Sequence, residues 1–335
     1  MTEYLWGRKC KILIAKKSGE AIDVSTLRCL FKVTKIGLSP VNFAEVTAHN
    51  LSVQTENMVI EESDRLIIEA GYSGYLEEQE KGSAKQVKSD ARYGKIFDGE
   101  IVQAIRDKDE NNVDYRLMII AIDGDQGLNL NFVKMTANKG INQRDIVNYA
   151  AGQAKVPLEV GHISPDIGDK VLPRGKVFFG EPKKYFRQVA QDNNGTYWVE
   201  DGQLVVAKLT DIPPGEALVL TPKNGLIGTP QQTIDGVYFK CLLDPRIRLR
   251  TMVKIDNSYI RQMKLEASQI MTVKGNTPQV SFLPVILDQD GQYQVQNVTH
   301  HGDTRGNDWY SEIAGVSRNG KGLVSMLAYA GQNPF

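Results

Sequence analysis

The stretch Leu27-Arg28-Cys29-Leu30-Phe31-Lys32-Val33 decides the fold class of the N-terminal part of the chain. Its apolar residues recur at every second position, which places them on one face of an extended strand. The run Cys10-Lys11-Ile12-Leu13-Ile14 is also typical of a strand. The sequence therefore predicts that the chain begins with β structure.

Further strand-like segments lie at 45–52, 65–72, 95–106, 115–122 and 128–135. Little helical periodicity separates them, so residues 1–138 are predicted to form a small β-barrel or sandwich domain. Residues 76–93 break the pattern, because charged side chains alternate there with Gly and Ser. We expect a long charged loop at 76–93.

Beyond Gly140 the hydrophobic period becomes helical. Asn142 can cap a helix, and Pro182 is suited to the first position of a second one. Asp201-Gly202 then separates two strand-like runs, as in a tight hairpin. Residues 139–208 are therefore predicted to form a small α/β domain, in which Trp198 packs in the core against the second helix.

The remaining residues, 209–335, again predict β structure, as a second β-barrel domain with a C-terminal segment. The expected strands lie at 217–221, 236–243, 252–256, 280–287, 293–300 and 309–316. The predicted order is thus a β domain, an α/β insert and a β domain, in a mainly β protein.

Composition excludes several classes of protein. Lys+Arg and Asp+Glu both number 40, and this zero net charge argues against a generic nucleic-acid binder. The first residues hold no apolar segment of a secretion signal, and no apolar run is long enough to cross a bilayer. The three cysteines, Cys10, Cys29 and Cys241, cannot all be paired and form no CxxC motif, which favours synthesis in a reducing cytoplasm.

One segment has the spacing of a phosphate-binding loop. Gly315-Val-Ser-Arg-Asn-Gly-Lys321-Gly322 places a glycine where such a loop needs Ser or Thr to hold magnesium. Asn319-Gly320 is better explained as a hairpin turn. We therefore expect no nucleotide or other cofactor.

Two segments have some features of metal sites. Asp123-Gly124-Asp125 begins like a calcium loop, but Leu128 and Lys134 occupy the positions that require Gly and Glu, so a tight turn between strands is expected. His300 and His301 would point to opposite faces of a strand, and the other histidines, His49 and His162, lie in different predicted domains. No metal site is predicted.

No set of catalytic residues is recognisable: the chain has no GxSxG motif and no cysteine in a nucleophile setting. A pair of glycosidase carboxylates cannot be identified by counting, because such a site is defined by distance. Arg246, Arg248 and Arg250 would share one side of an extended chain, either as a solvated strand edge or as a basic stripe that meets a protein partner or the outer surface.

Eleven short segments occur in the order found in one family. They are YLWGR at 4–8, DVSTLRCLF at 23–31, EAGY at 69–72, GKIFDG at 94–99, DGD at 123–125, LPRGK at 172–176, WVEDG at 198–202, LIGTPQQT at 226–233, GV at 236–237, CLLDP at 241–245 and HHGDTRG at 300–306, the last followed by Trp309. Together they resemble the baseplate hub family of contractile-tailed bacteriophages over nearly the whole chain. Two departures are Arg250, where the family pattern has glycine, and the longer loop at 76–93.

The resemblance implies two β-barrels related to the tail tube subunit, on either side of a small inserted domain. It also implies a homotrimer, whose six barrels match the sixfold tail tube on one side while its threefold symmetry matches the central spike on the other. The implied partners are the tail tube protein, the spike, neighbouring baseplate proteins and the tape-measure protein. DNA would be only a cargo of the channel. The implied location is the virion baseplate, with no catalytic residue and no membrane insertion.

The sequence is compatible with two alternatives. A monomeric ligand-binding β protein, for example a tail-fibre adaptor, is compatible with the composition. A cell-wall glycan hydrolase is the other, although no segment resembles a lysozyme or a peptidase. Oligomeric mass would separate the hub from the first alternative, and activity on peptidoglycan would identify the second.

Overall fold

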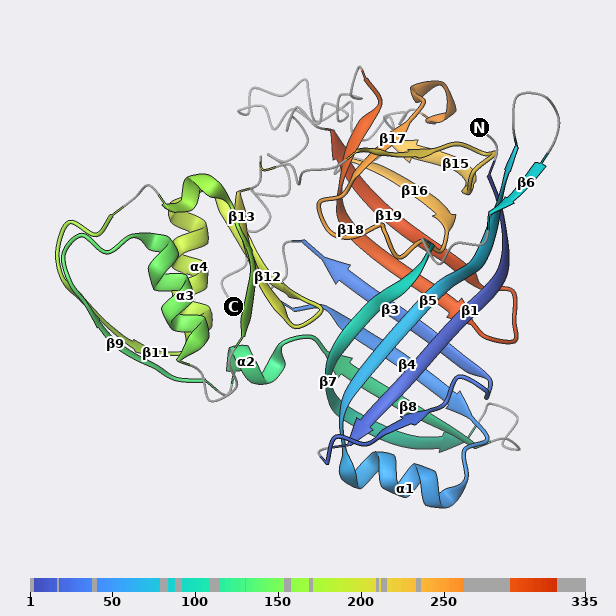
Figure 1. The fold of residues 1–335 in the computed structure, drawn as a ribbon, viewed down its shortest axis with the longest axis horizontal. Helices are drawn as coiled ribbons and strands as arrows, with labels where there is room; N and C mark the ends of the chain where they lie inside the picture. Colours follow the sequence, from blue (N-terminus) through green and yellow to red (C-terminus); the bar gives the residue numbers. More distant parts are fainter. Residues whose placement is uncertain are drawn as a thin grey trace, which may run out of the picture.

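The computed structural model has a mainly β fold with a small helical insert, and Figure 1 shows the two parts side by side. It describes residues 3–16, 18–37, 41–78, 84–87, 92–108, 115–129, 131–153, 158–168, 171–208, 211, 216–232, 236–261 and 290–317. The fold class predicted from the sequence is thereby confirmed.

Most strands belong to one 14-stranded sheet. Its strands are β1 (Glu3–Lys16), β2 (Ala21–Asp23), β3 (Cys29–Ile36), β4 (Phe43–His49), β5 (Ser63–Glu78), β6 (Ala84–Val87), β7 (Tyr93–Lys108), β8 (Tyr115–Ile122), β14 (Leu218–Leu220), β15 (Leu226–Gln232), β16 (Val237–Leu242), β17 (Met252–Ile255), β18 (Gln292–Asp303) and β19 (Trp309–Ser317). The main path runs β15-β16-β19-β18-β3-β4-β8-β7-β5-β1-β2. The N-terminal and C-terminal β regions are therefore joined where β18 pairs with β3.

Buried and more exposed side chains alternate along the strands, so one face of the sheet packs into two hydrophobic cores. In β3 the residues Cys29, Phe31 and Val33 are buried, as their spacing predicts, and they pack in a cluster with β1, β4, β5 and β8. The C-terminal strands bury a second cluster that includes Phe239 and Ile313. Helix α1 (Val53–Glu62) lies at one end of the first cluster and contributes the buried Val59.

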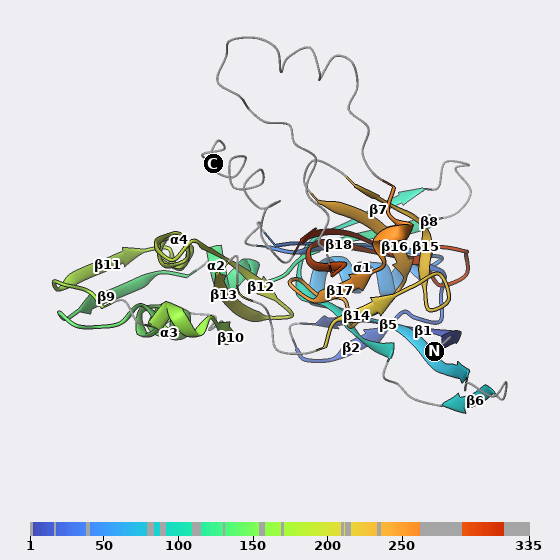
Figure 2. The same cartoon turned by 90° about the horizontal axis from the view of Figure 1, so that it is seen from above.

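The middle unit has its own core beside the large sheet (Figures 1 and 2). Its elements are α2 (Asp125–Asn129), β9 (Val133–Ala137), α3 (Gln143–Gly152), β10 (Glu159–Ile163), β11 (Lys176–Gly180), α4 (Pro182–Asp192), β12 (Gly195–Glu200) and β13 (Gln203–Lys208). β10, β13 and β12 form a three-stranded sheet, and β9 pairs with β11 as a two-stranded ribbon.

Local signals predicted this unit well. Asn142 caps α3 by accepting a hydrogen bond from the backbone N–H of Asp145, and Pro182 occupies the first turn of α4. Asp201 and Gly202 have φ angles of +56° and +82°, as a two-residue turn with left-handed residues requires.

Three expectations were wrong. Segment 128–135 is not one strand, because α2 extends to Asn129 and β9 begins only at Val133 and pairs with the middle unit. Helix α1 was not predicted, although Ser52 accepts a hydrogen bond from Thr55 N–H at its start. The charged segment 76–93 is not simply a loop, since β5 extends to Glu78 and pairs with β6. The strand expected at 280–287 lies outside the described residues.

Candidate functional site

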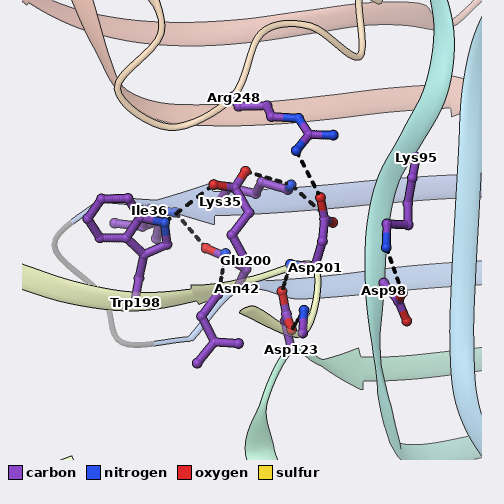
Figure 3. Close-up of polar contacts among 12 residues, drawn as sticks. Lys35, Ile36, Asn42, Lys95, Asp98, Asp123, Trp198, Glu200, Asp201 and Arg248 are labelled. Atoms are coloured by element: carbon purple, nitrogen blue, oxygen red, sulfur yellow. Dashed lines mark hydrogen bonds and ion pairs between the residues drawn. The ribbon is translucent and has the colours of Figure 1, made fainter. Parts of the chain in front are cut away.

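A buried lysine joins the large sheet to the middle unit. Lys35, in β3, is 2 % exposed, and its Nζ lies 2.9 Å from Oε1 of Glu200 and 3.6 Å from Oδ1 of Asp201 (Figure 3). Burial disfavours the ammonium, but the negative charges of Glu200 and Asp201 outweigh this cost and raise the pKa of Lys35. The β12–β13 hairpin is thus held to β3 by charge.

Asp123 binds the backbone of the turn in the same hairpin. Its carboxylate accepts hydrogen bonds from the backbone N–H groups of Asp201, at 2.5 Å, and Gly202, at 3.0 Å. Burial raises the pKa of Asp123 to about 7, although both hydrogen bonds favour the ionised form. The acidic residue that resembled the start of a calcium loop therefore binds backbone N–H groups of its own chain.

The C-terminal β region completes this arrangement. A guanidinium nitrogen of Arg248 lies 3.5 Å from Oδ2 of Asp201. We refer to Lys35, Asp123, Glu200, Asp201 and Arg248 as the junction cluster. It brings together β3, the end of β8, the β12–β13 hairpin and the loop before β17, so segments far apart in sequence meet at one point (Figure 3). Lys35 and Asp201 are buried there, while the Arg248 side chain is half exposed.

Trp198 lies next to the junction cluster and is 2 % exposed, as predicted for a core residue. Its predicted partners were wrong, because it packs with Ala207 and Leu249 on the side of the hairpin that faces away from α4. The neighbouring Tyr197 points to α4 instead and contacts Phe186. Adjacent strand residues point to opposite faces, so Tyr197 and not Trp198 lies on the face that packs against α4.

The predicted arginine stripe does not form. Residues 244–251 form turns rather than an extended strand, so the three side chains do not share one side. Arg246 pairs with Asp244, at 2.6 Å, and Arg248 pairs with Asp201. Arg250 is buried, which contradicts the expectation that it faces a partner or the outer surface.

Arg250 has a φ of +68°, at the position where the family resemblance led us to expect a glycine. Left-handed backbone strains a residue that has a Cβ. Its guanidinium donates hydrogen bonds to the carbonyl oxygens of Lys208 and Asp211 and lies 5.9 Å from the ring centroid of Trp198. Burial lowers the pKa of Arg250 to about 10. The side chain therefore fixes the segment that leaves β13.

The remaining sequence motifs are not brought together as a site within the described residues. Gly315 to Ser317 belong to β19, and the rest of the P-loop-like segment lies outside the described residues. The turn at Asp123-Gly124 leads into α2 rather than into a strand. No group of three or more His, Cys, Asp or Glu residues suited to a metal occurs in the part of the chain that the structure describes.

Two histidines and two cysteines pack within the β sheet and show no arrangement typical of a catalytic site. His300 is buried and lies 2.7 Å from the hydroxyl of Ser311, and burial lowers its pKa to about 3. His301 points to the opposite face and stacks on Tyr310. Burial raises the pKa of both Cys10 and Cys29 to about 12, so neither thiol is an activated nucleophile at neutral pH.

The second notable surface is one face of the sheet from β15 to β7, an antiparallel run of eight strands. One face of this run packs against the two cores, while the described residues of the other face, which we call the open face, are half-buried or exposed. Its charges are balanced: Lys32 is paired in register with Glu45, and Nζ of Lys240 lies 3.9 Å from Oε1 of Glu312. No helix within the described ranges is long and apolar enough to cross a membrane.

Both ends of the eight-stranded run have unpaired strand edges. In the described chain no strand pairs with the second edge of β7 at 102–108 or of β15 at 226–229. Large apolar side chains are exposed close to each edge: Val102 and Ile105 on β7, and Ile227 and Tyr238 on or next to β15. Exposed apolar edges are typical of surfaces that pair with another chain.

Comparisons with known proteins give the family. Residues 27–260 match the model of the family described as baseplate hub gp41. No sequence match to a curated protein was found.

Two solved structures share the fold. The 43 kDa tail protein of prophage MuSo2 from Shewanella oneidensis aligns with a TM-score of 0.54 and 9 % identity over 93 % of this chain and 99 % of that one. A tail protein from Neisseria meningitidis aligns with a TM-score of 0.50 and 10 % identity over 93 % and 97 %. With its family model matched over most of its length and its fold shared with phage tail proteins, the chain belongs to the baseplate hub gp41 family and is a structural component of a phage tail.

Proposed function

We propose that three copies of this chain form a ring that adapts the tail tube to the central spike, and that the open face lines a channel for genome delivery. The observation that carries this proposal is a face of eight antiparallel strands that no other described element covers, with an edge at each end that no described strand pairs. Such a sheet is incomplete alone, because unpaired edges favour pairing with another chain.

Strand direction supports head-to-tail closure. The run from β15 to β7 contains an even number of strands, all antiparallel to their neighbours. The edge of β7 therefore runs opposite to the edge of β15, and β15 of the next copy can continue the alternation. A heterologous contact of this kind closes into a ring when the rotation between copies allows it.

The dimensions suit a channel. Strands in a sheet lie about 4.8 Å apart, so eight from each of three copies give a circumference of about 115 Å and a backbone diameter of about 37 Å. Strand tilt would increase both values. An α-helix with its side chains is about 10–12 Å wide, so the passage would admit several helices of a tape-measure protein or a nucleic acid.

The chemistry of the open face suits passage rather than binding. Its lysines lie opposite glutamates, as in the pairs Lys32–Glu45 and Lys240–Glu312. A wall with excess positive charge would bind phosphate by releasing counterions and would slow DNA. DNA is accordingly proposed as cargo only.

We propose the domain division predicted from the sequence: two barrels, at 1–138 and 209–335, and a middle domain at 139–208. The three main hydrophobic clusters support it, although Leu243 and Trp309 of the C-terminal region pack in the first of them. The junction cluster would hold the middle domain at a fixed angle to the ring. The segment 125–137 packs with the middle domain, so the first boundary would move towards residue 124.

The remaining assignments follow from the family and from the buried state of the reactive groups. The chain would contact the tube, the spike, neighbouring baseplate proteins and the tape-measure protein, after synthesis in the host cytoplasm. No catalytic, metal or cofactor residue is assigned. The buried cysteines and the internally paired acidic residue Asp123 support this assignment.

The experiment is a measurement of mass and shape. Purified full-length chain, alone and with its tube and spike proteins, is studied by native mass spectrometry and electron microscopy. The proposal predicts a trimer and a ring with an axial opening. A chain that stays monomeric at high concentration with both proteins present would contradict the hub role.

A further inference from the structure

The ribbon formed by β9 and β11 has one buried and one exposed face. Val133 and Phe178 point inward and are nearly fully buried in the core of the middle unit. On the outer face Phe132, Val177 and Phe179 are 53 %, 68 % and 63 % exposed. Three exposed large apolar side chains close together on so short a ribbon are typical of a surface that binds another molecule.

These side chains form one patch, which we call the ribbon patch. The rings of Phe132 and Phe179 are in edge-to-face contact, with centroids 4.5 Å apart. Val177 is in register with Thr136, and Phe179 with Lys134. The ribbon lies at the end of the middle unit farthest from the large sheet, and no described element covers its outer face (Figures 1 and 2).

The charge of the ribbon is one-sided. The segments 131–140 and 171–180 contain four basic residues and no acidic residue. Lys176 donates a hydrogen bond to Gln188. The other three, Lys134, Lys139 and Arg174, are exposed, and none forms an ion pair with any residue in the described part of the chain.

We propose that the ribbon patch docks an acidic, amphipathic segment of another protein of the tail assembly. Aromatic side chains with basic neighbours fit a partner whose apolar residues cover the rings while its carboxylates meet the lysines. This inference does not depend on the ring or on the open face, since the ribbon belongs to neither.

Charge argues against occupants from the same protein. If two copies packed patch against patch, Lys134 would approach the like charge of the second copy. The C-terminal segment 318–335 carries Arg318 and Lys321 and no acidic residue, and segment 262–289 holds equal numbers of basic and acidic residues. A partner with excess negative charge is a better complement.

The test uses full-length protein and two soluble fluorescent peptides that differ only in charge. Each has one apolar face, and the polar face carries glutamates in one and lysines in the other. Fluorescence anisotropy should show binding of the glutamate peptide alone. Phe179→Ser should weaken that binding about tenfold, as for a central aromatic contact.

Two variants make the test specific. Lys134→Glu should weaken the binding of the glutamate peptide, because it replaces one of the four basic residues of the ribbon with a carboxylate. Val53→Ser is the control, because Val53 on α1 is 67 % exposed, like Val177, but lies on the first β region. Equal binding of both peptides, or equal loss in the Val53 variant, would overturn the proposal. So would binding of a single-stranded oligonucleotide that Phe179→Ser abolishes, since the patch would then be a base-stacking surface.

Discussion

The junction cluster and the open face use charge in opposite ways. Lys35 and Lys32 lie on the same strand. Lys35 is 2 % exposed and lies beside the carboxylates of Glu200 and Asp201. Lys32 is exposed and lies opposite Glu45 on the neighbouring strand β4. A buried charge must be paired, so it fixes the position of its partners. An exposed pair contributes little to stability and leaves the surface neutral. The first arrangement sets geometry, and the second keeps a surface free of strong binding.

The largest expected effect comes from Lys35→Met. This change leaves the buried Glu200 without its closest cation and removes one of the two cations beside Asp201. Breaking a buried ion pair costs about 3–5 kcal/mol. Lys32→Met is the matched control and should change the free energy of unfolding by less than about 1 kcal/mol. Urea unfolding of both variants measures the difference. Similar small losses would mean that Lys35 is not essential to the junction.

The junction cluster should also respond to pH. The pKa of Asp123 is about 7 in the folded chain and near 3.8 when unfolded, so the folded state binds more protons between these values. Stability contributed by this group is therefore present at low pH and is lost as pH rises from about 4 to about 7, by at most about 1.4 kcal/mol per pH unit.

The variant Asp123→Asn separates the contribution of Asp123 to the pH dependence of stability from the contributions of other titrating groups. His300 acts in the opposite direction, because its lowered pKa of about 3 makes stability fall as pH drops below about 6.5. Comparing wild type with Asp123→Asn removes that contribution from the difference. The stability of wild type relative to the variant should decline from pH 4 to pH 7. A constant difference would contradict the raised pKa.

A smaller effect separates backbone strain from side-chain contacts at Arg250. Arg250→Ala loses the hydrogen bonds to Lys208 and Asp211 but keeps a Cβ at a φ of +68°. Arg250→Gly loses the same bonds and relieves the strain, so it should be about 1 kcal/mol more stable than the alanine variant. Thermal unfolding of both proteins checks the order. Equal stabilities would show that the left-handed backbone is not strained here.

The smallest effect is expected on the open face. Tyr238→Ser removes a half-exposed ring near the edge of β15 and should change the stability of the isolated chain by less than about 0.5 kcal/mol. The same change should weaken association between copies. Analytical ultracentrifugation at several concentrations measures the association, and urea unfolding measures the stability of the monomer. A large loss of monomer stability would place this ring inside the fold rather than near an edge that meets another copy.

The sequence predicted local structure well and the junction poorly. Period-two burial identified β3, and Asn142 and Asp201-Gly202 marked a helix cap and a turn, because these signals depend on neighbouring residues. The contact of Lys35 with Glu200 joins residues far apart in sequence, which no local pattern contains. The sequence did contain one sign of this contact. Lys35 follows Cys29, Phe31 and Val33 at the same alternating positions of the strand, on its buried face, where a lysine needs an acidic partner.

The same limit explains the arginines. Alternation suggested an extended stripe, but Asp244 captures Arg246 and the turn at Arg250 reverses the chain, so tertiary contacts override the period. The departure from glycine at Arg250 was visible in the sequence, and the positive φ gives its physical meaning.

The account depends most directly on the pairing of β7 with β15 of the next copy. Cysteines placed at Ile105 and Ile227 in one chain, treated with a short thiol crosslinker, test this contact, with each single variant as control. The account predicts covalent trimers on a denaturing gel for the double variant and crosslinked species for neither single variant. Monomers alone, or dimers formed by a single variant, would contradict a head-to-tail ring.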